Sequence, residues 1–134
     1  MSPTLVTWAP RVLSILRIVA AFIFLLHGTQ KLFAFPGPPP SGVLPPLMSQ
    51  YGIGAIMELV GGLLLMFGLF TRPVAFLLSG EMAVAYWQFH FPRNFWPTLN
   101  GGDASILYCF VFLYIAFTGP GPWSIDAQRG RRTF

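Results

Sequence analysis

Long apolar runs separated by short breaks constrain the fold of this chain more than any other feature. They cover residues 12–35, 53–70, 74–91 and 104–118 of a 134-residue sequence that is 54% hydrophobic and only 9% charged. A water-soluble domain of this size needs more polar surface. A helix of about 20 apolar residues crosses the hydrocarbon core of a bilayer. The sequence therefore predicts an all-α fold, an integral membrane four-helix transmembrane bundle that forms a single domain.

Proline and glycine mark the ends of the predicted helices. The sequence Pro-Gly-Pro-Pro-Pro at residues 36–40 ends the first run and opens an uncharged connection. Residues 71–73 make so short a turn that the second and third runs must form an antiparallel hairpin. Residues 92–97 end the third run, and Asn-Gly-Gly-Asp at 100–103 offers capping groups for the fourth. The fourth run is short for a span, so a re-entrant segment is the alternative there.

The basic residues predict how the bundle is oriented. With an even number of spans, both termini and the 71–73 turn share one side of the membrane. That side carries Arg11, Arg17, Arg72, Arg129, Arg131 and Arg132, whereas the opposite side has Lys31 and Arg93. Lys and Arg favour the cytoplasmic side. We therefore expect a multi-pass protein of the inner (plasma) membrane with both termini in the cytoplasm.

Charge and cysteine content exclude several classes of protein. The net charge of +4 comes from basic residues beside apolar runs, so no nucleic-acid partner is expected. A single cysteine, Cys109, excludes an internal disulfide or a CxxC redox pair.

The first run follows basic residues as in a signal peptide, but it is long and contains Arg17, His27 and Lys31. We interpret it as a membrane helix.

Ionisable side chains inside the apolar runs mark the candidate site, because each costs about 2.5 to 3.5 kcal/mol at the bilayer centre on insertion scales. His27 and Lys31 are four residues apart and share one stripe of the first helix. Glu58 lies between Gly54 and Gly62, which let a neighbouring helix approach closely, at a comparable depth. We expect an ion pair or hydrogen-bonded group of His27, Lys31 and Glu58. On these residues alone, a functional site and a structural network are equally consistent.

Two further polar groups are predicted. Arg17 and Glu81 match in depth and are expected to form a structural ion pair that fixes helix register. His90, Asn100 and Asp103 fall at the outer ends of the third and fourth helices, where they would extend the first group into a polar funnel. The two histidines lack HxxxH or ExxH spacing, so no metal site is expected.

An ordered set of motifs carries a family resemblance. The set consists of Arg17, Phe24-Leu25-Leu26-His27-Gly28, Lys31-Leu32, Glu58 with Gly61-Gly62, Gly68-Leu69, Thr71-Arg72, Met82, Ala85, His90, Asn100-Gly101-Gly102-Asp103, Leu107-Tyr108, Gly119-Pro120-Gly121 and Ser124-Ile125-Asp126. In this order the motifs resemble the DoxX family over nearly the whole chain. Asp103 is a departure, since the family more usually has Glu there. The resemblance implies a four-helix membrane protein. Family membership predicts a fold more reliably than it predicts a reaction.

Some DoxX relatives are subunits of thiosulfate:quinone oxidoreductase or associate with a terminal quinol oxidase, and others are linked to complexes that handle thiols and oxidative stress. The resemblance therefore implies a membrane subunit of a respiratory or thiol/sulfur-linked redox system. In this hypothesis His27 and Glu58 are the catalytic groups that exchange protons with a quinone. The candidate quinone-binding residues are Lys31, His90, Asn100 and Asp103. No haem, flavin or iron–sulfur motif occurs, so a protein partner must supply the electrons; whether the chain is itself an enzyme stays open.

Two other functions fit the same residues. The chain could be a non-catalytic scaffold or assembly subunit whose ion pairs hold the helices together and whose loops dock a redox complex, or it could assemble with copies of itself. A small-solute or proton pathway through the polar funnel ranks last, because Arg17 and Glu81 would have to separate and no broken helix or inverted repeat is evident.

Overall fold

The computed structural model describes residues 1–130 and contains helices and no strands over that range. In chain order the elements are α1 (Pro3–Phe33), α2 (Gln50–Phe67), α3 (Thr71–Ala85), the π-helical turn η1 (Tyr86–His90), the 3₁₀ turn η2 (Phe91–Arg93), α4 (Pro97–Asn100), α5 (Asp103–Thr118) and α6 (Ile125–Gln128). Of the basic residues that predict the orientation, Arg131 and Arg132 lie outside the described residues.

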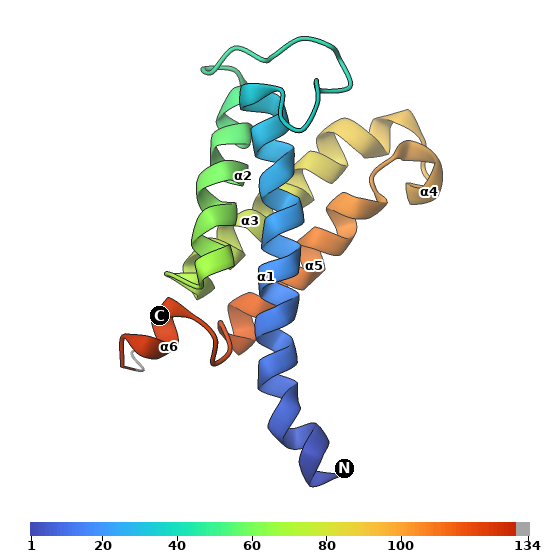
Figure 1. Ribbon diagram of the computed structural model, residues 1–134. Coiled ribbons are helices and arrows are strands. Elements are labelled where there is room, and N and C mark those ends of the chain that lie inside the picture. Colours follow the sequence, from blue (N-terminus) through green and yellow to red (C-terminus); the bar gives the residue numbers. More distant parts are fainter. Residues whose placement is uncertain (131–134) are drawn as a thin grey trace.

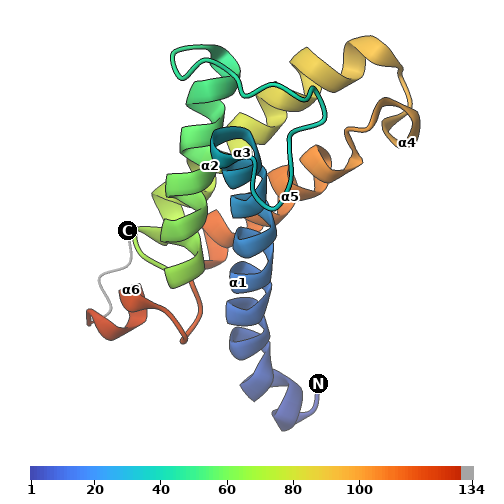
Figure 2. The same cartoon turned by 45° about the horizontal axis from the view of Figure 1, so that its top comes forward.

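The helices pack as two pairs that diverge towards one end of the molecule. Helix α1 lies along α2, and α3 lies along α5 in an arm that leans away from α1 (Figure 1). The loop of residues 34–49 covers the end at which α1 stops and α2 begins, as the turned view also shows (Figure 2). At the opposite end the chain after α5 folds back beside the α2–α3 turn as α6. The arm and α1 are therefore farthest apart towards the end that the loop covers.

Two of the helices, α1 and α2, are long and apolar enough to cross a membrane, and α5 is a shorter apolar helix. Helix α1 begins nine residues before the predicted start of the first span. The Ser2 hydroxyl caps the N–H of Leu5, and Pro3 occupies the first turn, where its missing N–H leaves no bond unmade. At 31 residues, about 46 Å at 1.5 Å per residue, α1 is longer than a bilayer core requires.

The third apolar run is not the single regular helix that its sequence predicts. Helix α3 ends at Ala85, and the next turn is a π-helix in which the N–H of Phe91 bonds to the carbonyl of Tyr86. A π turn holds one extra residue and therefore rotates the side chains that follow it. Gln88, within this turn, exchanges hydrogen bonds of 2.6 and 3.3 Å with Gln50 at the start of α2.

Glycines bring α1 and α2 into backbone contact, as predicted for the glycines that flank Glu58. A Cβ atom at Gly62 would lie 3.1 Å from the Cα of Leu25. One at Gly28 would lie 2.8 Å from the carbonyl oxygen of Ala55 and 3.1 Å from the Cβ of Glu58. The end of α1 is thus held directly against the turn of α2 that carries the carboxylate.

An apolar core lies between the two helix pairs. It consists of Ala21, Phe24, Leu65, Ala75, Leu78, Met82, Phe112 and Ile115. The rings of Phe24 and Phe112 meet edge to face with centroids 5.0 Å apart, and both side chains are inaccessible or nearly so. Cys109 packs against this core, as expected for a small apolar residue. The core separates the polar groups near the loop end from those near α6.

Candidate functional site

The centre of the candidate site is an ion pair between α1 and α2. The ammonium of Lys31 lies 2.8 Å from Oε1 and 3.0 Å from Oε2 of Glu58, so one cation bonds both oxygens of the carboxylate. Only 5% of the Glu58 side chain is exposed, against 30% for Lys31. An ammonium has three N–H donors. Two of them bond Glu58, and the third has no hydrogen-bond acceptor among residues 1–130.

Local structure explains why the pair forms. Lys31 lies in the last turn of α1, which ends at Ala34 in the left-handed conformation. Gly28, one turn earlier, is the residue that allows α2 to approach. Glu58 is the ninth residue of α2 and faces α1 from there. The expectation of an ion pair at this depth is confirmed.

His27 belongs to the same group but makes a different kind of contact. Its ring is exposed, lies near enough to Glu58 and Lys31 for their charges to act on it, and has no hydrogen-bond partner among residues 1–130. The edge of the ring meets Tyr108 of α5, with ring centroids 6.1 Å apart. His27 is therefore free to bond a ligand that enters between α1 and α5.

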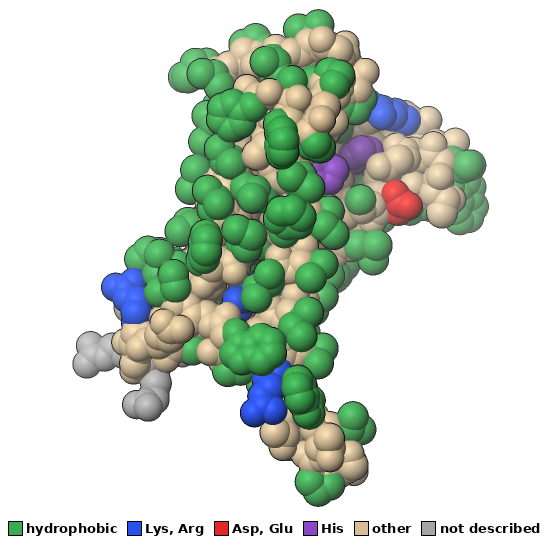
Figure 3. Space-filling view, viewed as in Figure 1, with side chains coloured by type: hydrophobic (Ala, Val, Ile, Leu, Met, Phe, Trp, Pro, Cys, Tyr) green, Lys and Arg blue, Asp and Glu red, His purple; other side chains and the backbone are tan. Residues whose placement is uncertain are grey.

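Figure 3 shows histidine side chains gathered in the recess between α1 and the arm, with Lys or Arg and Asp or Glu side chains at its edge. Hydrophobic side chains cover most of the remaining surface in this view. The same view shows further Lys or Arg side chains towards the end that carries α6.

The predicted ion pair of Arg17 with Glu81 is not formed. The Arg17 side chain is completely buried and donates its hydrogen bonds to three backbone carbonyls, those of Leu65, Pro120 and Trp123. The bond to Leu65 measures 2.8 Å and that to Trp123 measures 2.6 Å. The segment after α5 folds beneath the bundle and supplies two of these acceptors. Each nitrogen of the guanidinium thus donates to a backbone carbonyl and none to a carboxylate among residues 1–130.

Glu81 instead belongs with the ion pair at the other end of the bundle. Its Oε1 atom lies beside Gly54 of α2, where an added Cβ would be 3.3 Å away. Its Oε2 atom is buried and has no hydrogen-bond partner. Glu81 is also close enough to Glu58 and Lys31 for their charges to act on it. One lysine therefore lies near two carboxyl groups.

His90 and Asn100 lie together, but Asn100 is not an open ligand. Nδ1 of His90 is 3.2 Å from the carbonyl oxygen of Asn100. The Asn100 amide is 2% exposed; its nitrogen bonds Tyr86 and the carbonyl of Asn94, and its oxygen accepts from the N–H of Gly102. These bonds hold the α4–α5 turn against η1. In the structure the Asn100 amide thus serves the turn, and substrate binding by Asn100 stays a prediction.

Asp103 is exposed at the first position of α5. Its carboxylate bonds only the adjacent N–H of Ala104, at 3.1 Å, among residues 1–130. The N-terminal residue of a helix favours a negative charge. Among residues 1–130, Asp103 is therefore not bonded to Lys31 or Glu58.

Sequence reasoning missed Tyr108, the neighbour of His27. The signal was one of the two tyrosines of the fourth apolar run, the one nearer its start. Tyr108 also packs on Phe24 and Phe112, at centroid distances of 5.2 and 5.6 Å. The ring thus joins the polar group to the apolar core. Within residues 1–130, no three His, Cys, Asp or Glu side chains are placed to hold a metal ion together.

A helical protein with an ion pair and a histidine between apolar helices is a membrane protein with a polar interior, and the comparisons identify its family. The DoxX family matches residues 12–91. An uncharacterized protein of Haemophilus influenzae is 42% identical over 125 residues, which cover 89% of this chain and 91% of that protein. The chain belongs to the DoxX family.

Two Escherichia coli proteins are also similar. Inner membrane protein YphA is 30% identical over 135 residues, covering 89% of this chain and 91% of that protein. Inner membrane protein YqjF is 28% identical, with coverage of 82% and 85%. No solved structure matches the chain.

Proposed function

We propose that this chain is a membrane subunit of a respiratory or thiol/sulfur-linked redox system and that it binds a quinone headgroup in the recess beside His27, Lys31 and Glu58. The observation that carries the proposal is that side chains with free hydrogen-bonding groups lie beside an aromatic side chain. Among residues 1–130, Lys31 keeps one N–H free after bonding Glu58 and His27 has no hydrogen-bond partner, and the half-buried ring of Tyr108 lies nearby.

A quinone headgroup matches this arrangement chemically. Its carbonyl oxygens accept hydrogen bonds, its ring packs against aromatic side chains, and its isoprenoid tail prefers lipid. Reduction to the quinol takes up two electrons and two protons, one at each carbonyl oxygen. His27 and Glu58 are the groups placed to transfer those protons. The electrons come from a protein partner, since the sequence carries no haem, flavin or iron–sulfur motif.

The proposal includes four membrane crossings, by α1, α2, α3 with η1, and α5, and both termini in the cytoplasm. The described residues of the α6 end include Arg11, Arg72 and Arg129, and the loop end has Lys31 and Arg93. The quinone site then opens in the outer half of the bilayer. Cysteine labelling of the termini and of the 34–49 loop in intact cells tests this orientation.

Quinone binding is tested with purified protein in detergent. Titration with a short-chain quinone should give saturable binding that weakens at least tenfold in Lys31→Met and His27→Ala. Arg93→Gln, a charge change at the same end but outside the recess, is the matched control. Absence of saturable binding, together with unchanged quinone-linked activity of Glu58→Gln in native membranes, rejects the proposal.

A scaffold role is the second candidate, and exposed side chains at the tip of the arm favour it. Phe95 is 66% and Trp96 60% exposed, next to each other between η2 and α4. A scaffold tolerates His27→Gln but loses its partner when Phe95 and Trp96 are both changed to Ser. The proton or solute pathway lacks such support, because Phe24 and Phe112 fill the bundle between the two polar ends.

A further inference from the structure

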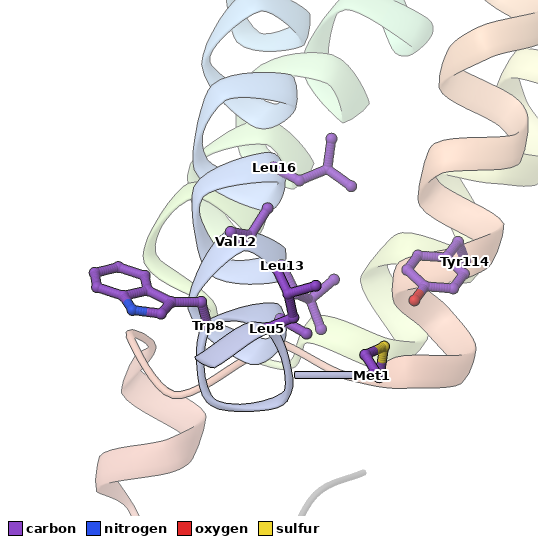
Figure 4. A pocket seen from close by; sticks show the side chains of 8 residues that line it. Met1, Leu5, Trp8, Val12, Leu13, Leu16 and Tyr114 are labelled. Atoms are coloured by element: carbon purple, nitrogen blue, oxygen red, sulfur yellow. The ribbon is translucent and has the colours of Figure 1, made fainter. Parts of the chain in front are cut away.

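A groove of about 380 Å³ lies between the N-terminal half of α1 and the end of α5, away from the candidate site. Its walls include Leu5, Trp8, Val12, Leu13, Leu16 and Tyr114 (Figure 4). These walls are mainly apolar, so the groove indicates no particular ligand chemistry. A buried ionisable group that the proposed function does not use is found instead on α3, in Glu81.

The carboxyl group of Glu81 lies where α3 meets α2. A Cβ atom added at Gly54 would be 3.3 Å from Oε1 of Glu81, and Oε2 is buried without a hydrogen-bond partner among residues 1–130. Gly54 and Glu58 are four residues apart and therefore share one side of α2, about 6 Å from each other along the helix. Glu81 thus approaches α2 about one turn away from Glu58.

One cation serves these two carboxyl groups. The ammonium of Lys31 bonds both oxygens of Glu58, at 2.8 and 3.0 Å, and makes no hydrogen bond to Glu81. Glu81 is nevertheless close enough to Lys31 and Glu58 for both charges to act on it. A carboxylate at Glu81 would therefore be a second negative charge beside a lysine that Glu58 already uses.

The other ionisable groups of this end offer Glu81 no compensating charge. The ring of His27 on α1 is exposed and meets Tyr108 of α5 with its edge. His90, which follows α3, lies against the carbonyl of Asn100, and Asp103 is exposed at the first position of α5. None of these groups bonds Glu81 among residues 1–130.

A carboxyl group in this position favours its neutral, protonated form. Burial of an uncompensated charge among apolar side chains costs more free energy than retention of a proton. A neutral carboxyl group also tolerates a missing hydrogen bond at lower cost than a carboxylate does. The buried and unbonded Oε2 atom is therefore compatible with a protonated Glu81 and not with an ionised one.

We propose that Glu81 stores a proton and passes it, directly or through one water molecule, to Glu58, which gives it to the quinone. The transfer part of the proposal rests on the proposed function. The O–H bond of Glu81 breaks and one forms on Glu58; that bond then breaks as the proton binds the quinone oxygen, which has received its electron from the partner protein. Glu81 is left as a carboxylate and regains a proton from water. It thus supplies one of the two protons of quinol formation and acts through Glu58, without contact with the quinone.

Infrared spectroscopy of the purified protein at neutral pH, in a detergent without ester groups, tests proton storage. The chain has four Asp and Glu side chains, so the carbonyl band of one protonated carboxyl group, identified by its shift in heavy water, can be assigned by substitution. The band should be present in the unchanged protein and absent from Glu81→Gln, which keeps the shape of the neutral group. Asp103→Asn, the matched change of an exposed carboxylate, should retain it.

Lys31→Met should add a second component to the band, because Glu58 then also lacks a cation and takes up a proton. Circular dichroism checks that each variant is folded. Absence of the band from the unchanged protein, or its survival in Glu81→Gln, overturns the proposal.

Proton transfer is tested in native membranes with a short-chain quinone. Glu81→Gln should bind the quinone as tightly as the unchanged protein but lower quinone-linked turnover by at least about tenfold, since a positioned proton-transfer group contributes about 10²–10⁴-fold. Unchanged turnover overturns the transfer from Glu81. Absence of quinone binding by the unchanged protein rejects the proposed function and the transfer with it, whereas the infrared band still decides whether Glu81 stores a proton.

Discussion

Arg17→Met tests the most specific structural finding, that a buried arginine fastens the C-terminal segment beneath the bundle. The change keeps an unbranched side chain but removes every donor. Three carbonyls, those of Leu65, Pro120 and Trp123, then lose the hydrogen bond that the guanidinium donates, although the Leu65 carbonyl still accepts from the N–H of Gly68. All three lie around a side chain that is 0% exposed, so water cannot readily replace the guanidinium.

The magnitude follows from the number of bonds. Hydrogen bonds to charged groups contribute about 1.5 to 3 kcal/mol each in soluble proteins, which sets an upper limit of about 4.5 to 9 kcal/mol for three. Hydrogen bonds measured inside a membrane protein average about 0.6 kcal/mol, which sets a lower limit near 2 kcal/mol. Relief of the cost of burying the guanidinium reduces the upper limit. We expect the free energy of unfolding to fall by about 2 to 5 kcal/mol.

The assay is reversible unfolding in mixed micelles of a mild detergent and dodecyl sulfate, followed by far-UV circular dichroism. Arg129→Gln is the matched control, because Arg129 is exposed and contacts only the ring of Phe70, at 5.9 Å. Arg17→Lys should be intermediate, since an ammonium lacks the planar fork that reaches several carbonyls. Glu81→Gln separates the structural finding from the ion-pair hypothesis, which would make it as harmful as Arg17→Met. A loss below about 0.5 kcal/mol, the usual range for a surface substitution, would refute the reasoning.

Three further predictions concern the contacts between elements. Gly28→Ala places a Cβ 2.8 Å from the backbone of α2 and should destabilise the protein by about 1 to 3 kcal/mol, whereas Gly80→Ala, with open space around it, should be neutral or stabilising; thermal unfolding in detergent compares the two. Asp126→Asn removes a charge that bonds two N–H groups at the start of α3 and should cost about 1 to 2 kcal/mol, measured in the same way; an unchanged transition would contradict that capping role. Lys31→Met should destabilise the protein more than Lys31→Met combined with Glu58→Gln, because the single change leaves a buried carboxylate unpaired; equal or additive losses in a double-mutant cycle would show that the pair is uncoupled.

The contact between Lys31 and Glu58 was predictable from the sequence because both residues lie on regular helices. Steps of four residues place His27 and Lys31 on one stripe, and counting 1.5 Å per residue from the loop gives Glu58 a matching depth. The glycines beside Glu58 indicate that the first and second helices touch. They therefore predict which side of the second helix faces the first, as well as the depth of Glu58. Lys31 and Glu58 accordingly meet as predicted.

A match in depth was not enough to predict whether Arg17 and Glu81 form an ion pair. Two helices at equal height can still present their charged groups to different neighbours, and the sequence contains no pattern that gives the rotation of α3 relative to α1. The acceptors of Arg17 include two backbone carbonyls after α5, and a carbonyl carries no sequence signal. The hydrogen bonds of Asn100 were unpredictable for a similar reason, because they join its amide to turn backbone that is in place only when α4 and η1 pack together.

The sequence by itself therefore determined that this chain is helical and belongs in a membrane, that its apolar runs end at particular prolines and glycines, and that Lys31, Glu58 and His27 share one level. These properties depend on composition and helical periodicity, which are local. The tertiary structure decided that Arg17 binds the C-terminal segment, that Glu81 lies beside Gly54 of α2 and not with Arg17, that η1 turns the end of the third run, and that the two helix pairs diverge. Those outcomes depend on how helices rotate and cross, and such choices are set by packing between residues far apart in the chain.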